Sequence, residues 1–208
     1  MRGASVNPSG TAQDPAGIEP VVETVPAGHR PVTYAPGDFV LSKAHGIKHW
    51  LIKLGQRIQL HGMDNRYARY THAAIIVSDD GELVEAVGTG VRKSSLDAYV
   101  KANEVYQVVH ITANDDDREQ IVAFANAKLG QARYGVVAIL STTLWAFTGS
   151  KFTFFHNGTY TCSGLVANAL LRINTEFPNN AACVMPAQLA VRLKAPPPPA
   201  DRLPRALA

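Results

Sequence analysis

Cys162 is the residue whose type and position point most directly to chemistry. It lies in the small polar run Thr161–Gly164, and apolar side chains at helical spacing follow over residues 165–170. The pattern predicts a core-packed helix with Cys162 at or just before its first turn. Free N–H groups and the positive dipole end of such a helix favour the thiolate, which is the nucleophilic form of cysteine. The alternative is a structural role, since free cysteines are often buried.

A cysteine nucleophile needs a base, and the base needs a group that orients it. The sequence has seven histidines: His29, His45, His49, His61, His72, His110 and His156. His72 differs from the others because it begins a strand that is otherwise apolar. Glu85 lies between small apolar residues on the return strand, where a carboxylate needs a partner. Pairing of His72 with Glu85 across the strands would fix the histidine tautomer and favour the imidazolium. A structural histidine is the alternative.

Short strands are expected to hold these side chains in place. The pattern predicts a strand over residues 71–77, a turn over Ser78–Gly81 and a return strand over residues 82–87. An earlier strand is predicted over residues 39–41, and an alternating pattern predicts a later one over residues 104–111.

Helices are expected to cover the strands. Ser94 or Ser95 is predicted to cap a short helix that runs through Tyr99. The acidic run Asn114–Asp117 is interpreted as a helix start rather than a calcium loop, because it lacks the ligand spacing of an EF-hand. Three further segments are predicted: an amphipathic helix over Ile47–Leu60, an apolar aromatic cover over Tyr134–Phe155, and a short helix that begins in Met185–Leu189.

The composition divides the chain into three parts. Residues 1–32 are rich in Gly, Pro and Ala and are predicted to form a flexible leader. Residues 33–194 are expected to form one domain, and residues 195–208 a proline-rich tail outside its packing.

Charge and cysteine content exclude several classes of function. A net charge of +3 with scattered basic residues does not favour nucleic-acid binding. Two cysteines are too few for a disulfide framework, although a bridge between Cys162 and Cys183 would abolish the thiol chemistry.

The sequence shows no export signal or membrane span. Residues 1–30 lack the apolar region of a Sec signal, and the longest apolar run, residues 135–147, is too short to span a bilayer. We therefore expect a cytoplasmic protein, or one delivered by a non-Sec route or within a phage particle.

Two segments together resemble a known enzyme family. The run Thr-Cys-Ser-Gly-Leu-Val over residues 161–166 resembles the Asp-Cys-Ser-Gly-Leu-Val helix start of NlpC-like papain-fold cysteine peptidases. Residues 71–86 resemble that family's histidine strand, glycine turn and following strand, and Glu85 matches the position of the family's third polar residue. Thr161 stands where the family often has aspartate.

The order of the motifs differs from that of NlpC enzymes, in which the cysteine precedes the histidine. Here His72 lies 90 positions before Cys162. This order, with the early Pro-Gly-Asp-Phe-Val segment, is similar to the circularly permuted branch of the superfamily. That branch includes YiiX-like and YaeF-like hydrolases and lecithin:retinol acyltransferase-like enzymes. The resemblance covers about residues 34–193 and implies an α+β, permuted papain-like fold, an antiparallel sheet or barrel packed against helices, with the nucleophile at a helix N-terminus.

The resemblance also implies roles for single residues. Cys162 would be the nucleophile, His72 the base and then the acid, and Glu85 the orienting residue. The backbone N–H of Cys162 would be one oxyanion donor, and Tyr34 is a candidate for the second. The implied reaction is acyl transfer through a thioester, without a cofactor or a metal.

The implied substrates are acyl lipids or peptidoglycan peptides. The two apolar segments, residues 47–60 and 134–155, tilt the choice toward a lipid and toward a peripheral membrane contact, although both can pack on a core instead. A second hypothesis is a non-catalytic structural or binding module that keeps the fold within a larger assembly such as a phage particle. A third, a metal site of His72, Glu85 and Cys162, has no supporting ligand spacing.

Overall fold

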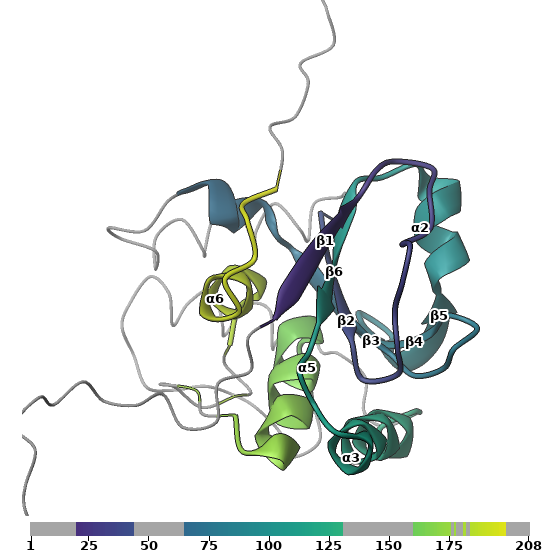
Figure 1. Cartoon of the computed structure of the whole chain (residues 1–208), viewed down its shortest axis with the longest axis vertical. Coiled ribbons are helices and arrows are strands. Elements are labelled where there is room, and N and C mark those ends of the chain that lie inside the picture. The colour runs from purple at the N-terminus through teal and green to yellow at the C-terminus, as the bar shows by residue number, and fades with distance from the viewer. Residues whose placement is uncertain are drawn as a thin grey trace, which may run out of the picture.

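The computed structural model describes residues 20–43, 65–130, 160–175, 177, 181 and 184–198. These residues form a mixed α+β structure around one antiparallel sheet of six strands, in the order β1-β6-β2-β3-β4-β5 (Figure 1). The strands are β1 (Val21–Val25), β2 (Phe39–Ser42), β3 (His72–Ile76), β4 (Glu82–Val87), β5 (Gly90–Ser95) and β6 (Tyr106–His110). The described helices are α2 (Leu96–Ala102), α3 (Asp115–Ala127), α5 (Cys162–Leu170) and α6 (Pro186–Arg192), with short 3₁₀ turns η1 (Asn65–Arg69) and η2 (Leu171–Ile173).

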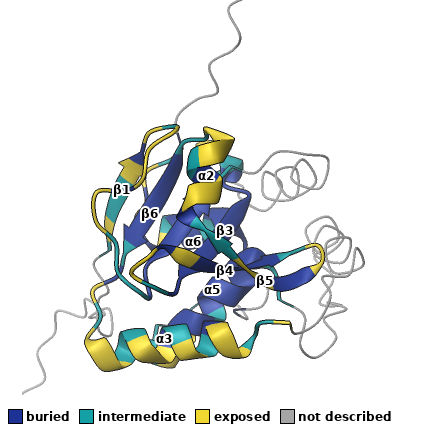
Figure 2. Ribbon diagram, turned by 90° about the vertical axis from the view of Figure 1, so that its right-hand side faces the viewer, coloured by how far each residue is buried: buried dark blue, intermediate teal, exposed yellow. Residues whose placement is uncertain are grey.

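Helices cover both faces of the sheet. On one face, Ala73 and Ile75 of β3 belong to a core cluster that includes residues from α3, α5 and α6. On the other face, Ala74 and Ile76 belong to a cluster with Leu96 and Tyr99 of α2. All five residues of β3 are buried, as expected for a central strand with both faces covered. Figure 2 shows the buried sheet and α5 at the centre, with exposed residues along α2 and α3.

The predicted hairpin is confirmed, and it continues into a third strand that the sequence analysis missed. Strands β3 and β4 match the predicted segments at 71–77 and 82–87. The residues after β4 do not lead directly to a helix, because Gly90–Ser95 pair with β4 along its whole length. Ser95 precedes α2 as predicted, but its side chain makes no capping hydrogen bond.

Both predicted outer boundaries of the domain are wrong. Residues 21–25, placed in the flexible leader, form β1 and pair with β6. Ala195, placed in the tail, is fully buried. The carbonyl of Pro196 accepts hydrogen bonds from Tyr70 Oη at 2.5 Å and from Gln107 Nε2 at 3.1 Å. The ordered structure therefore extends beyond residues 33–194 on both sides, since sheet pairing and buried polar groups hold these segments.

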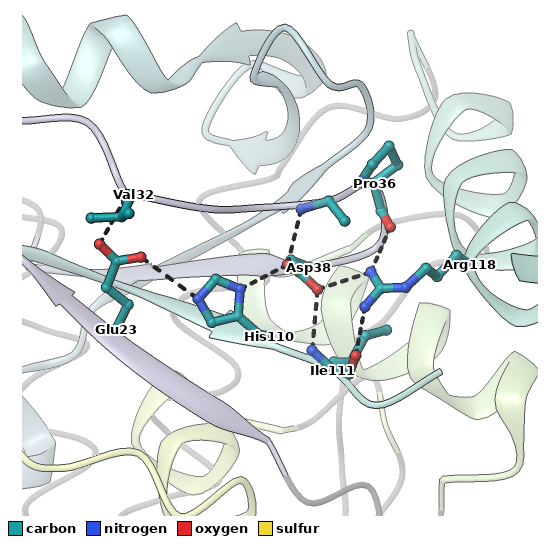
Figure 3. A network of polar contacts seen from close by, with 8 residues as sticks. Glu23, Val32, Pro36, Asp38, His110, Ile111 and Arg118 are labelled. Atoms are coloured by element: carbon teal, nitrogen blue, oxygen red, sulfur yellow. Dashed lines mark hydrogen bonds and ion pairs between the residues drawn. The ribbon is translucent and has the colours of Figure 1, made fainter. Parts of the chain in front are cut away.

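Asp38, in the turn before β2, is a buried polar junction between several elements (Figure 3). One carboxylate oxygen accepts from Ala35 N and His110 Nδ1, and the other from Ile111 N and Arg118 Nη1, at 2.9 to 3.1 Å. Four donors satisfy the buried charge, as burial requires. The carboxylate thus ties β2 to the end of β6 and to α3.

The structure confirms the helix start at Asn114, whose side chain accepts from the backbone N–H of Asp117. A short helix after Met185 is also confirmed as α6. The predicted segments at Ile47–Leu60 and Tyr134–Phe155 lie outside the described residues. Within the described residues, no helix is both long and apolar enough to cross a membrane.

Candidate active site

Cys162 is the first residue of α5, as the sequence pattern predicts. Thr161 is the N-cap, and its hydroxyl oxygen accepts from Gly164 N at 2.9 Å. Every residue of the helix except Asn168 is buried, and the helix packs against the sheet, α3 and α6. Cys162 is a free thiol and is 5% exposed. The Cys162 sulfur therefore forms no disulfide, and Cys183 lies outside the described residues.

The backbone at the start of β3 lies beside the Cys162 sulfur. Sγ is 3.9 Å from the carbonyl oxygen of Thr71, and the N–H groups of Ala73 and Ser163 donate toward the sulfur. Strand β4 pairs with β3 only from Ala74 onward. The beginning of β3 is thus available to α5, and the two elements meet around the cysteine.

His72 contacts both partners that the sequence analysis proposed for it. Its Nε2 lies 2.7 Å from Glu85 Oε2. His72 also lies close enough to Cys162 to lower the pKa of the thiol, and Cys162 in turn raises the pKa of His72. Because Glu85 engages Nε2, Nδ1 is the ring nitrogen that remains available to another partner. The structure therefore brings Cys162, His72 and Glu85 into one series of interacting groups, in which His72 and Glu85 are hydrogen-bonded.

Arg92, from the missed strand β5, extends this series. Its Nε and Nη2 both contact Glu85 Oε1, at 3.0 and 2.8 Å. Each carboxylate oxygen of Glu85 therefore has its own cationic partner, His72 on one and Arg92 on the other. The sheet register explains this arrangement, because Arg92 lies directly opposite Glu85 in the β4–β5 pair.

Sheet register also places a row of polar residues on one face. Ser42 lies opposite His72, and Tyr106 lies opposite Ser42. Directly opposed residues point to the same side of a sheet. With Glu85 and Arg92, these side chains follow the sheet from β5 to β6 on the face that α2 covers.

The charges in this series shift one another's ionisation. Burial alone would lower the pKa of His72, but its hydrogen bonds to Cys162 and Glu85 outweigh burial and raise that pKa to about 10. Burial opposes ionisation of Cys162, yet His72 and the nearby N–H groups lower the pKa of the thiol. For Glu85, His72 and Arg92 outweigh burial and lower the pKa. A thiolate–imidazolium pair is the expected state at neutral pH.

Tyr99 of α2 closes the same face over the polar row. Its hydroxyl is buried and forms no hydrogen bond of ordinary geometry. The side chain of Ser42 lies close to this hydroxyl. Burial and the nearby Glu85 carboxylate raise the pKa of Tyr99, so its hydroxyl stays protonated. From the sequence, Tyr99 is predicted only as a helix residue, and its place beside the site has no local signal.

Tyr34, the suggested second oxyanion donor, is not brought to the site. Its hydroxyl lies near Gly81, in the turn between β3 and β4, and 3.4 Å from Arg30 Nη1. His72 stands at the other end of β3 from that turn. The structure therefore does not bring Tyr34 to the site, and its assignment as the second oxyanion donor is wrong.

A metal centre finds no support in the part of the chain that the structure describes. There, no group of three or more His, Cys, Asp or Glu side chains is arranged to hold a metal ion.

Two comparisons with known proteins identify no family for this chain. The chain matches no protein-family model, and a search of curated proteins finds no match.

Proposed function

We propose that this protein is a cysteine hydrolase or acyltransferase that acts on an amide or ester bond. The observation that carries the proposal is the position of His72, which binds Glu85 and lies close enough to Cys162 for each group to shift the pKa of the other. A nucleophile, a base and an orienting group within hydrogen-bond reach are the usual signature of covalent acyl transfer. The location of the thiol at a helix start supports the same reading.

Each residue has a defined step in this reaction. The Cys162 thiolate attacks the substrate carbonyl carbon, and the backbone N–H of Cys162 at the start of α5 donates to the developing oxyanion. His72, as imidazolium, gives its proton to the leaving amine or alcohol, and a thioester remains on Cys162. His72 then accepts a proton from water or another acceptor nucleophile as that nucleophile attacks the thioester carbonyl, and the Cys162 thiolate is released. Glu85 keeps the ring oriented through both halves.

The fold proposal goes further than the α+β sheet itself. We infer a circularly permuted papain-like arrangement, in which the histidine strand precedes the cysteine helix in the chain. In support, β3 and β4 carry His72 and Glu85, and α5 follows them with Cys162 at its first position. The order of these elements fits the permuted hydrolases that the motifs resemble.

Two substrate classes remain in the proposal, acyl lipids and peptidoglycan peptides. The two apolar segments that favour a lipid lie outside the described residues, so the site itself does not choose between them. Incubation of the purified protein with lipid vesicles and with peptidoglycan fragments, followed by mass analysis of the released products, separates the two classes. Cys162→Ala is the control, because it removes the nucleophile and leaves the substrate-facing surface unchanged elsewhere.

A thiol-directed covalent probe tests the assignment of the nucleophile. We expect a low concentration of iodoacetamide at pH 6 to label Cys162 faster than Cys183, as mapped by peptide mass spectrometry. The non-catalytic hypothesis predicts ordinary reactivity at Cys162 and no turnover of either substrate. Equal, slow labelling of both cysteines together with no product would therefore replace the hydrolase proposal with the binding-module hypothesis.

A further inference from the structure

Glu85 depends on a group that reaches it from the surface. The Glu85 side chain is 5% exposed, whereas that of Arg92 is 59% exposed. Two nitrogens of the guanidinium converge on the single oxygen Oε1, which leaves Oε2 for His72 Nε2. A carboxylate held at only one oxygen can rotate about its last bond, and the second anchor removes that freedom.

Two cationic groups stabilise the Glu85 carboxylate, one on each neighbouring strand. His72 on β3 and Arg92 on β5 flank the carboxylate in the sheet. Tyr99 on α2 lies close enough to be affected by the Glu85 carboxylate, and Cys162 on α5 interacts with His72; neither supplies a positive charge. During the proposed reaction His72 alternates between charged and neutral forms. Arg92 is then the only one of these four groups that stays positive throughout.

We propose that Arg92 is a positioning residue of the site, which keeps Glu85 ionised and turned toward His72 while the histidine gains and loses its proton. This role presupposes the proposed acyl transfer, in which His72 acts first as acid and then as base. Without Arg92, the buried carboxylate loses its constant counterion whenever His72 is neutral. Removal of one partner from a buried pair is costly because the remaining charge stays desolvated.

Strand β5 offers a matched control. Lys93, the next residue, forms an ion pair with Glu82 of β4 at 3.0 Å, and both of these side chains are about half exposed. Lys93→Gln and Arg92→Gln each remove one cation from β5 and one ion pair between the same two strands. They differ in that the carboxylate left behind contacts His72 only in the second case.

The experiment measures three quantities in the full chain for Arg92→Gln, Arg92→Lys and Lys93→Gln. These are the titration of the Glu85 carboxyl by ¹³C NMR, assigned with Glu85→Gln, the pH profile of kcat and KM for an activated ester, and the melting temperature. We expect Arg92→Gln to move the Glu85 titration to higher pH, because the carboxylate loses an adjacent positive charge. On the acid side of the pH profile, kcat should fall about tenfold with KM nearly unchanged, since such a loss changes the ionisation constant of a carboxyl by about tenfold or more. Arg92→Lys restores most of kcat because it restores the charge, and Lys93→Gln leaves both readouts unchanged.

Two results would overturn the role. One is a lower melting temperature in Arg92→Gln with an unchanged Glu85 titration and pH profile, which assigns Arg92 to fold stability alone. The other is an equal loss of kcat in Lys93→Gln, which assigns the effect to general weakening of β5. If no variant, including the wild type, turns over the ester while the Glu85 titration still moves, the electrostatic link stands and the proposed function fails.

Discussion

Nε2 of His72 lies 2.7 Å from Oε2 of Glu85, although the sheet register places Ala74, not His72, opposite Glu85. The two side chains are diagonal neighbours on one face of the β3–β4 pair. Long side chains can bridge such a diagonal, whereas two short ones cannot. The diagonal leaves His72 at the very start of β3, beside which α5 places Cys162 at its own first position.

The pH dependence of Cys162 tests the charge state of the pair. The pKa of the thiol is lowered, so alkylation should persist below pH 8.5, near which an ordinary thiol ionises. The pKa of His72 is raised to about 10, so the imidazolium that protonates the leaving group persists until the pH rises through that value. Turnover should fall as the pH drops through the thiol pKa and as it rises through about 10.

Rates of iodoacetamide labelling against pH, with peptide mapping, measure the first limb. His72→Asn is the comparison, because it removes the cation that stabilises the thiolate. We expect the labelling midpoint in that variant to move to higher pH. Identical midpoints near pH 8.5 in both proteins would contradict a thiolate–imidazolium pair.

Glu85→Gln tests the carboxylate with little change in shape. The Glu85 charge helps to raise the pKa of His72, so its loss should lower that pKa and move the alkaline limb of turnover to lower pH. A ¹⁵N NMR titration of the His72 ring measures this directly. Glu82→Gln is the control, since Glu82 pairs with Lys93 at the surface and its removal should leave the His72 titration in place.

Tyr99→Phe removes a buried hydroxyl that has no hydrogen bond of ordinary geometry. Deleting an unsatisfied polar group is close to neutral or stabilising, so we expect no loss in the free energy of unfolding. Tyr106→Phe is the matched case, because that hydroxyl donates to the His29 carbonyl at 2.9 Å and its loss should cost about 1 kcal/mol. Urea denaturation compares the two. A larger loss in Tyr99→Phe would reveal a partner for its hydroxyl.

Asp38→Ala tests the buried junction away from the site. The change leaves Arg118 and His110 without their carboxylate and should destabilise the fold by about 3 kcal/mol, as for other broken buried pairs. Asp97→Ala also removes a carboxylate from an arginine, Arg30, but both side chains are about half exposed and the expected change is below about 1 kcal/mol. Equal destabilisation in the two variants would contradict the expectation that the buried Asp38 contacts stabilise the fold more than the exposed Arg30–Asp97 pair does.

Local patterns were sufficient to single out Cys162, His72 and Glu85 as candidates. Each lies in a short segment whose own residues predict its secondary structure, and the hairpin turn between β3 and β4 is marked by Gly81. Arg92 was missed because its role depends on a third strand. Gly88 and Thr89 form a two-residue turn into β5, and only the resulting register puts Arg92 opposite Glu85.

The predicted boundaries of the domain, residues 33 and 194, missed ordered segments for a related reason. Val21–Val25 contains β-branched residues that favour a strand, but prolines on both sides gave it the composition of a linker. Its strand character depends on pairing with β6, far along the chain. Pro196 likewise has no local signal for packing, and Tyr70 and Gln107 supply its contacts from distant positions. Long-range pairing cannot be predicted from composition alone.

The docking of α5 on the start of β3 has a consequence for how the molecule acquires its reactivity during folding. The three strands β3, β4 and β5 are joined by short turns and can pair early, whereas the contact of His72 with Cys162 closes a loop of 90 positions. We expect refolding chains to regain β-sheet circular dichroism before Cys162 becomes labile at low pH. A chain still emerging from the ribosome, with its histidine and glutamate already made, would therefore carry no activated thiol until the helix has been synthesised and has reached the sheet.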